Sequence, residues 1–317
     1  MAGHLAGPAE QSGPRFPGHD SAGMGESRVQ EFNYAAPQTV REALELLGCA
    51  GEDATLLAGG QSLMILLQQR LVRPSVVIGL RHIGGLDAIR VTDGHLAIGA
   101  MATYHALAGN SEISTHAPIL GRAAGSVGSV HIRNRGTAGG SLCHADPAGD
   151  VPTVLLALGA ELMVAGAGGA SRRHPADTFF TGLFETALAP GEMLTGIEVA
   201  PPAQTASYGY RRFSFREGEY PMCVAAVRLL WSDGCCCGVS LAVGGAADRP
   251  GRLAEAERAL TGMEPSADIA ARLLRGVRDL VRPASDVRGS GEWKARVVEK
   301  VVTDAVTEAV REQVRRG

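Results

Sequence analysis

The spacing of apolar residues predicts a compact α/β unit soon after residue 30. Apolar side chains recur at helical spacing from Val40 to Leu47. Thr39 precedes this run and Glu42 follows three residues later, which is the spacing of a capping box at a helix N-terminus. Beyond the helix, the pattern predicts a strand, a helix and a second strand, at residues 54–58, 62–69 and 75–80.

A hairpin and further helices are expected next. Residues 88–91 and 96–100 are rich in apolar side chains and flank Asp93-Gly94, a dipeptide typical of a two-residue hairpin turn. Thr103 can cap a helix that runs through Leu107. The pattern then predicts an apolar helix and two strands, at residues 151–158, 162–165 and 194–199.

The residue composition changes at Pro201-Pro202, and we interpret this change as a domain boundary. Three alternating segments follow, with a hairpin turn at Ser232-Asp233-Gly234, and then three amphipathic segments. Strands are expected at 208–215, 223–231 and 237–243, and helices at 253–260, 269–281 and 293–314. Three strands followed by three helices predict an antiparallel sheet with helices on one face, so the predicted fold class is α+β.

The first 28 residues differ from the rest of the chain. They hold six glycines and three prolines and almost no large apolar side chains. Such a segment cannot bury enough surface to offset its ordering entropy, so we expect a disordered extension over 1–28. It lacks the long apolar stretch of a signal peptide, and Met24 is a candidate for the true start.

The composition, net charge and cysteine content of the chain exclude several classes of function. The chain has 317 residues, 45% of them hydrophobic, and a formal net charge of −3, which excludes a basic field for nucleic acid. Six cysteines without a Cys-x-x-Cys pair argue against a zinc site or a self-held iron–sulfur cluster, and they indicate a reducing compartment. Glu161 interrupts the most apolar stretch, 151–170, so no membrane segment is expected and a cytoplasmic location is favoured.

Two glycine-rich turns are the strongest candidates for ligand binding, at residues 58–62 (Ala-Gly-Gly-Gln-Ser) and 137–141 (Thr-Ala-Gly-Gly-Ser). Paired glycines permit positive φ and let backbone N–H groups approach a ligand, and a following helix start suits a pyrophosphate. For each pair alone, a tight turn is the alternative interpretation. Two such turns far apart in the chain favour a long diphosphate ligand held between subdomains. Neither turn matches the Rossmann or P-loop pattern.

Longer segments around both turns resemble a known family. The segments are 56–86 (LLAGGQSLMILLQQRLVRPSVVIGLRHIGGL), 96–108 (LAIGAMATYHALA) and 131–162 (HIRNRGTAGGSLCHADPAGDVPTVLLALGAEL). They resemble the FAD-binding medium subunits of molybdenum hydroxylases, the xanthine dehydrogenase and aerobic carbon monoxide dehydrogenase family. The resemblance extends from about residue 30 to 317.

This resemblance implies a specific domain organisation. An FAD-binding domain of the vanillyl-alcohol-oxidase (PCMH) type is expected over 29–203, in two subdomains of about 29–87 and 88–203. A C-terminal domain like that of carbon monoxide dehydrogenase flavoproteins is expected over 204–317. That domain should contain a three-stranded antiparallel sheet and a helical bundle.

The resemblance also assigns residues to FAD. The two turns are expected to hold the diphosphate and ribityl chain, Val127 to line the adenine end, and the backbone of Leu194 to meet the flavin ring. The complete set is Ala58, Gly59, Gly60, Gln61, Ser62, Leu63, Val127, Thr137, Gly139, Gly140, Ser141, Asp150, Leu194 and Arg211.

Two of these residues are charged. Asp150 matches a carboxylate that contacts the polar chain of the cofactor, where it can accept hydrogen bonds from hydroxyls; a helix N-cap ahead of Pro152 is its alternative role. Arg211 stands where relatives usually have lysine, and a cation there would stabilise reduced flavin. The alternative is a solvated surface arginine beside Arg212. The loop 216–221 is expected near the exposed flavin edge, where it would influence acceptor access.

Other polar and cysteine residues have plainer interpretations. His144 and Asp146 form a loop with Asp150 that is expected to hold hydrogen bonds and no metal. The triplet 235–237 is expected to pack in a strand, with Cys235 exposed at the turn.

The sequence therefore predicts an oxidoreductase subunit that contributes no acid or base to the substrate. By resemblance, a large molybdopterin-binding partner hydroxylates the substrate, and a small partner with two-iron two-sulfur clusters relays electrons to FAD. The expected final acceptor is NAD or another acceptor such as a quinone. Two alternatives are a stand-alone FAD-dependent reductase or oxidase on the same fold, and an assembly scaffold that has lost FAD.

Overall fold

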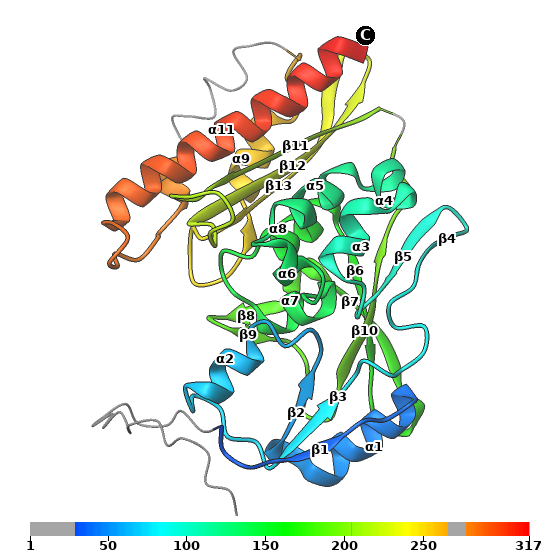
Figure 1. Ribbon diagram of the computed structural model, residues 1–317. Coiled ribbons are helices and arrows are strands. Elements are labelled where there is room, and N and C mark those ends of the chain that lie inside the picture. The colour runs from blue at the N-terminus through cyan, green and yellow to red at the C-terminus, as the bar shows by residue number, and fades with distance from the viewer. Residues whose placement is uncertain (1–28, 204, 266–276, 317) are drawn as a thin grey trace, which may run out of the picture.

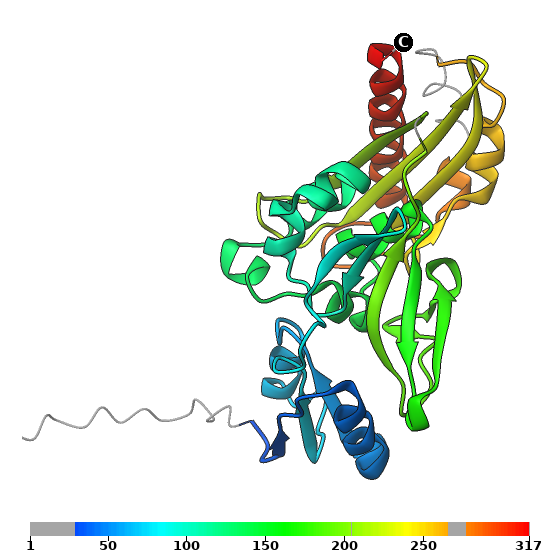
Figure 2. The same cartoon turned by 90° about the vertical axis from the view of Figure 1, so that its right-hand side faces the viewer.

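The computed structural model describes residues 29–203, 205–265 and 277–316. The predicted extension 1–28 and most of the predicted helix 269–281 lie outside the described residues. The described chain forms three tiers, with the N-terminal residues at one end and the last helix at the other (Figures 1 and 2).

The first tier is the predicted α/β unit. Its three strands are parallel and lie in the order β1-β3-β2. Thr39 caps the first helix as predicted, since its side chain accepts a hydrogen bond from the Glu42 amide. The elements are β1 (Asn33–Ala35), α1 (Val40–Ala50), the 3₁₀ turn η1 (Gly51–Asp53), β2 (Ala54–Leu57), α2 (Leu63–Gln68) and β3 (Val76–Gly79).

The second tier has a five-stranded antiparallel sheet in the order β4-β5-β10-β6-β7, covered by short helices. Asp93 and Gly94 form the predicted hairpin turn, with φ of 52° and 79°. Its strands are β4 (Ile89–Thr92), β5 (His95–Gly99), β6 (Glu161–Ala165), β7 (Ser171–Pro175), β10 (Met193–Val199) and a separate pair, β8 (Phe180–Gly182) and β9 (Glu185–Thr186). Its helices are α3 (Tyr104–Gly109), α4 (Ser111–His116), α5 (Pro118–Ser126), α6 (Val130–Arg133), α7 (Ala138–His144), α8 (Asp150–Leu158), η2 (Ala167–Gly169) and η3 (Ala176–Thr178).

The third tier contains the predicted antiparallel sheet with one additional strand. The order is β11-β12-β13-β14, and the short β14 was not predicted because a two-residue strand leaves no alternating pattern. The hairpin turn at Asp233 and Gly234 is present, with φ of 51° and 79°. The elements are β11 (Ala206–Phe213), β12 (Cys223–Ser232), β13 (Cys235–Gly244), β14 (Gly251–Arg252), α9 (Ala254–Leu260) and α11 (Gly291–Arg316).

The helices of this tier pack on one face of the sheet, as predicted, and the second tier covers the other face. Helices α9 and α11 pack on one face, where Ala225, Val227 and Leu229 join their core. On the other face, Val224 and Ala226 share the core of the second tier with α8. All nine residues of α8 are buried because the helix lies between its own tier and this sheet. The second and third tiers therefore share one continuous core.

Candidate cofactor-binding site

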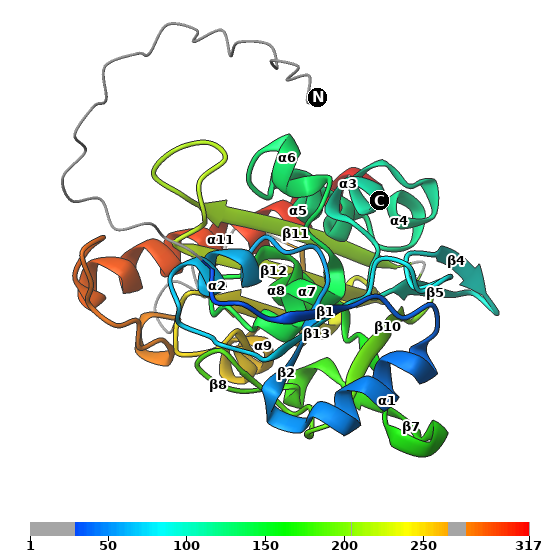
Figure 3. The same ribbon diagram turned by 60° about the horizontal axis from the view of Figure 1, so that its bottom comes forward.

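The two glycine turns, far apart in the sequence, lie against each other where the first and second tiers meet. A Cβ atom on Gly59 would stand 2.0 Å from the carbonyl oxygen of Arg135 and 3.0 Å from the Cα of Gly136. A Cβ atom on Gly140 would stand 3.4 Å from the Cβ of Ala58. The predicted convergence of the two turns is therefore present. Figure 3 brings forward the end of the molecule where the first tier lies in front of α7 and α8.

The first turn presents a row of backbone donors. Gly60 has a φ of 73°, as predicted for a turn that needs glycine. The Gln61 side chain braces the turn by donating to the Gly59 carbonyl at 3.1 Å. Within the described residues, the amides of residues 59–62 have no hydrogen-bond acceptor. Successive unpaired amides of this kind form a concave donor surface suited to an anion. Leu63 begins α2 immediately afterwards.

The second turn is itself the start of a helix. Thr137 caps α7 by accepting a hydrogen bond from the Gly140 amide at 3.1 Å, and Gly139 lies inside the first helical turn. Positive φ was expected for paired glycines, yet of the four glycines only Gly60 has it. The second pair is needed for space instead, because a Cβ on Gly139 would stand 2.6 Å from the Cβ of Ala100. Ser141 follows on the same helix, and its side chain limits the rise that burial causes in the pKa of Tyr104.

Asp150 lies in a buried polar cluster beside α7. Only 4% of the residue is exposed. The Tyr210 hydroxyl donates to its Oδ1 at 2.6 Å, and the Arg212 Nε lies 3.2 Å from the same oxygen. Burial raises the pKa of Asp150 to about 6, and Arg212 and the Tyr210 hydrogen bond limit that rise. Gly149 is the N-cap of α8 and Asp150 is its first helical residue, so the alternative role as N-cap is wrong.

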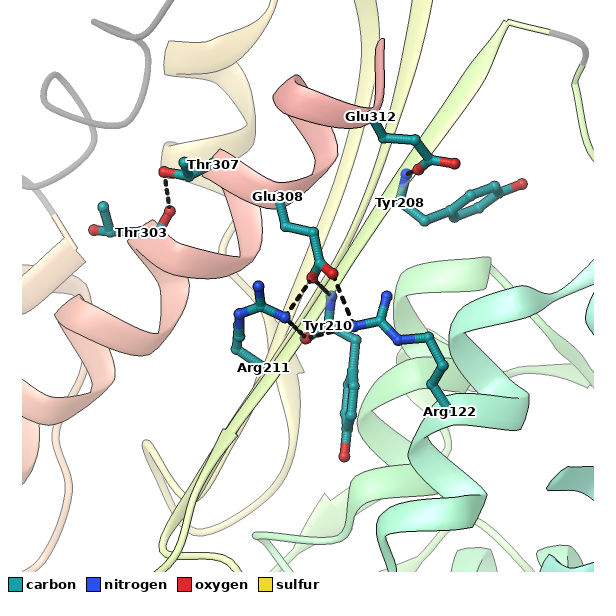
Figure 4. A network of polar contacts seen from close by, with 8 residues as sticks. All are labelled: Arg122, Tyr208, Tyr210, Arg211, Thr303, Thr307, Glu308 and Glu312. Atoms are coloured by element: carbon teal, nitrogen blue, oxygen red, sulfur yellow. Dashed lines mark hydrogen bonds and ion pairs between the residues drawn. The ribbon is translucent and has the colours of Figure 1, made fainter. Parts of the chain in front are cut away.

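Arg212, and not Arg211, reaches this cluster. Alternate residues of a strand point to opposite faces, so Tyr210 and Arg212 face the second tier while Arg211 faces α11. Arg211 donates to the Glu308 carboxylate at 2.9 Å and is 44% exposed (Figure 4). Its predicted contact with the flavin is therefore not supported by its position. The two-residue period of β11, anchored by the buried Tyr210, was the signal that could have identified Arg212.

Arg212 also ties two loops together. Its guanidinium donates to the carbonyl oxygens of Ser126 and Glu219. Its buried Nε forms an ion pair with the Asp150 Oδ1 at 3.2 Å and, within the described residues, makes no hydrogen bond. A buried donor that makes no hydrogen bond is a candidate to donate to a ligand.

Val127 and the loop 216–221 lie at the same end of the site. A Cβ on Gly218 would stand 3.8 Å from the carbonyl oxygen of Gly128, the residue after Val127. Arg133 holds this segment by donating to the carbonyls of Val127 and Gly128, at 3.1 and 2.7 Å. The resemblance assigned opposite ends of one dinucleotide to these neighbouring loops. The structure groups Val127 with the predicted flavin edge.

Leu194 connects to the second turn through the backbone. It lies in β10 beside a bulge, with its side chain in the core. The next residue, Thr195, accepts a hydrogen bond from the Ala100 amide at 3.0 Å. The Ala100 carbonyl in turn accepts from the Gly139 amide at 2.8 Å. The backbone at Leu194 is thus joined to the glycine pair by two hydrogen bonds.

Five residues around Asp150 and the second turn were not singled out from the sequence. Tyr104 was missed because the apolar pattern of its helix explains it as a core residue. Ser126 was missed because it ends a helix, 118–126, that the pattern did not predict. Tyr210 and Arg212 were missed because only strand alternation distinguishes them from Arg211. Tyr220 was treated only as part of a loop, yet its hydroxyl interacts with Asp146 and its pKa is raised by burial and by that carboxylate.

The remaining predictions concern metals and cysteines. No group of three His, Cys, Asp or Glu side chains in the described ranges is placed to hold a metal ion. Asp146 accepts a hydrogen bond from the Ala148 amide at 2.9 Å. In the cysteine triplet, Cys236 is buried and Cys237 is exposed, whereas Cys235, expected to be exposed, is partly covered. Among the helices that the structure describes, none is long and apolar enough to cross a membrane.

The residues present fit FAD by their chemistry. Unpaired amides at residues 59–62 suit a diphosphate, and a buried carboxylate suits the hydroxyls of a ribityl chain. The Arg212 guanidinium, which is paired with Asp150 and donates to the carbonyl beside Val127, provides a fixed cation at the same end.

Comparisons with known proteins agree with this chemistry. Residues 30–202 match the family model described as the FAD binding domain in molybdopterin dehydrogenase. Residues 208–309 match the model of the CO dehydrogenase flavoprotein C-terminal domain.

Individual relatives are similar over nearly their whole length. The chain is 34% identical to the nicotine 6-hydroxylase medium subunit of Paenarthrobacter nicotinovorans over 275 residues, which is 87% of this chain and 96% of that protein. It is 35% identical to the carbon monoxide dehydrogenase medium chain of Afipia carboxidovorans over 269 residues, covering 84% and 92%. A solved structure of carbon monoxide dehydrogenase from Hydrogenophaga pseudoflava superposes with a TM-score of 0.86 at 31% identity, covering 89% of this chain and 98% of that one.

Three observations lead to one assignment. The two glycine turns converge, the donors around them suit FAD, and the family matches span both halves of the chain. This chain belongs to the FAD-binding medium subunits of the molybdopterin hydroxylases, the carbon monoxide dehydrogenase and xanthine dehydrogenase family, and is an oxidoreductase subunit.

Proposed function

We propose that this chain carries FAD between an iron–sulfur partner and a final electron acceptor, either NAD or another acceptor such as a quinone. The observation that carries the proposal is the meeting of the two glycine turns around unpaired amides. The relatives are named as medium chains of carbon monoxide dehydrogenase and related enzymes. Such names imply a large molybdopterin-binding subunit and a small iron–sulfur subunit, and we infer the same partners for this chain.

Different residues of the site would bind different parts of the cofactor. The amides of Gly59 to Ser62 would hold the diphosphate, together with Leu63 at the start of α2 and the turn 137–141. Asp150 would accept hydrogen bonds from the ribityl hydroxyls. We infer that the FAD-binding domain ends near residue 203 and that the following domain contributes Tyr210 and Arg212 to the site.

Arg212 takes the role that the resemblance gave to Arg211. Its buried Nε is paired with the Asp150 carboxylate at 3.2 Å but makes no hydrogen bond within the described residues. A fixed cation near the flavin would favour the negatively charged reduced form and raise its midpoint potential. When bound, FAD can accept electrons singly and release them in pairs. The protein's part is to hold, orient and electrostatically stabilise it.

The electron route is tested with the FAD-loaded chain and the assembled complex. We expect the hydroxylase substrate to reduce the flavin only when the large and small partner subunits are present. If NAD is the acceptor, NADH should reduce the isolated chain under anaerobic conditions, as followed by loss of flavin absorbance. Direct reduction of the isolated chain by the hydroxylase substrate would contradict the proposal and support a stand-alone reductase or oxidase.

A further inference from the structure

Tyr210 is held from both sides at the junction of the second and third tiers. It lies in the middle of β11 and is only 5% exposed. Its hydroxyl reaches Asp150. Its backbone faces the last helix, α11 (Figure 4).

On the side of the second tier, the Tyr210 hydroxyl joins two residues. It donates to the Asp150 Oδ1 at 2.6 Å and lies 2.8 Å from the Ser126 Oγ. Because its one proton goes to the carboxylate, the Tyr210 oxygen is an acceptor toward Ser126, whose single hydroxyl proton is shared with the Ala123 carbonyl at 2.8 Å. Arg212 also approaches Oδ1, so Oδ2 is used by neither Tyr210 nor Arg212.

On the side of α11, one carboxylate fixes the backbone of the same residue. The Glu308 Oε2 accepts from the Tyr210 amide at 3.0 Å and from Arg211 at 2.9 Å, while its Oε1 accepts from Arg122 at 2.8 Å. Arg122 also donates to the Tyr210 carbonyl at 3.3 Å, and its guanidinium carbon lies 5.9 Å from the centre of the Tyr210 ring. Figure 4 shows this network gathered around Glu308. The tyrosine therefore has little freedom to turn away from Asp150.

We propose that Tyr210 is a positioning residue for the cofactor site, which orients the Asp150 carboxylate so that Oδ2 accepts hydrogen bonds from hydroxyls of bound FAD. The proposal rests on the proposed function, in which FAD lies at the glycine turns. Through this contact the C-terminal domain completes a site whose glycine turns both belong to the preceding domain.

The chemistry of Asp150 explains why such a residue is needed. A buried carboxylate tends to take up a proton, and a protonated Asp150 is a poorer acceptor. The groups that face it are Arg212 and Tyr210 of β11, Tyr104 of α3 and Tyr220 of the loop after β11. Of these, Arg212 supplies charge and Tyr210 supplies the direct hydrogen bond that favours the ionised form.

The test is the Tyr210→Phe variant, which removes the hydroxyl and keeps the ring. FAD affinity of the full-length chain is measured by quenching of flavin fluorescence between about pH 5 and pH 8. Loss of the hydrogen bond raises the pKa of Asp150, so affinity should begin to fall at a higher pH than in the wild type. At neutral pH we expect an affinity about tenfold lower, the size of one hydrogen bond to a charged group.

Tyr208→Phe is the matched control. Tyr208 is buried in the same strand, and its amide is held by Glu312 of α11 at 2.6 Å. This control should leave the pH midpoint of FAD binding unchanged. If Tyr210→Phe behaves like Tyr208→Phe, Tyr210 does not position Asp150 and the inference is overturned. If the wild-type chain takes up no FAD at all, the proposed function itself has failed.

The Asp150→Asn variant tests the inference independently of whether Tyr210→Phe folds. An amide does not titrate, so FAD affinity of Asp150→Asn should not change over this pH range. In the double variant, Tyr210→Phe with Asp150→Asn, the FAD affinity should likewise show no pH-dependent transition that Tyr210→Phe could shift. A wild-type pH dependence that persists in Asp150→Asn would show that another group titrates and would overturn the inference.

Discussion

Gly60 is the residue of the first turn whose backbone conformation restricts what can replace it. Its φ of 73° is costly for any side chain, and its Cβ would stand 3.3 Å from the Met64 side chain. We expect Gly60→Ala to reduce FAD affinity by about fivefold, because about 1 kcal/mol of strain is relieved by moving the amides out of line. Fluorescence titration with FAD measures this.

The control for that substitution is Gly234→Ala. Gly234 has a similar φ of 79° in the hairpin between β12 and β13, where a Cβ meets open space. It should lose comparable stability and keep its FAD affinity. Equal affinities for Gly60→Ala and the wild type would show that the first turn does not hold the cofactor.

The sequence identified the glycines of the site better than its charges. Gly60 could be recognised from its neighbours alone, since a glycine pair ahead of an apolar helix is typical of a turn that presents its backbone amides to an anion. Arg211 was preferred over Arg212 because similarity to a family pattern does not reveal which face of a strand a residue occupies. The placement of Tyr210 and Arg212 against Asp150 is the reason that our proposal favours Arg212.

Strand β11 and helix α11 approach each other unusually closely. A Cβ on Gly209 would stand 1.9 Å from the carbonyl oxygen of Ala305. As an edge strand, β11 also has outward amides, and Glu308 and Glu312 accept those of Tyr210 and Tyr208. The helix thus covers the open edge of the sheet with its side-chain carboxylates.

Gly209→Ala should therefore destabilise the protein. The added methyl group forces α11 away from β11, and overpacking of this kind costs about 3 kcal/mol. Chemical denaturation of the two chains measures the difference in the free energy of unfolding. The matched control is Gly251→Ala in β14 of the same sheet, where a Cβ has no neighbour within 4 Å. If Gly209→Ala has the same free energy of unfolding as the wild type, as we expect for the control, the close packing of β11 and α11 is contradicted.

At the level of elements, local signals predicted most of the fold. The caps at Thr39 and Thr103 and the two Asp-Gly hairpins were all identified, because each depends on only a few neighbouring residues. Helix α7 was not predicted, since two glycines oppose a helix. Thr137 and the hydrogen bonds from residues 138 and 139 to the carbonyls of Ala102 and Ala100 override that preference. Contacts of this kind join distant segments and leave no local pattern.

The shared core makes the second and third tiers one unit of stability. Tyr208 and Tyr210 of β11 belong to the same cluster as α8. Both tryptophans, Trp231 and Trp293, lie in the third tier, whereas both glycine turns lie in the first two tiers. Tryptophan fluorescence therefore reports on a part of the molecule without the glycine turns.

We expect FAD to raise the temperature at which the tryptophan signal unfolds. At a free FAD concentration one hundred times the dissociation constant, binding adds about 2.7 kcal/mol, or roughly 5–10 °C for a chain of this size. Thermal unfolding followed by tryptophan fluorescence, with and without FAD, measures the shift. A tryptophan transition that ignores FAD would mean that the third tier unfolds independently.

The contact of Gly59 with Arg135 and Gly136 has a consequence for engineering. Each turn serves as the wall against which the other is shaped, so neither is a portable motif. Transferring one turn into a different protein would remove the packing contacts that fix its conformation. Moving either turn to another protein would require moving the junction of the first and second tiers with it.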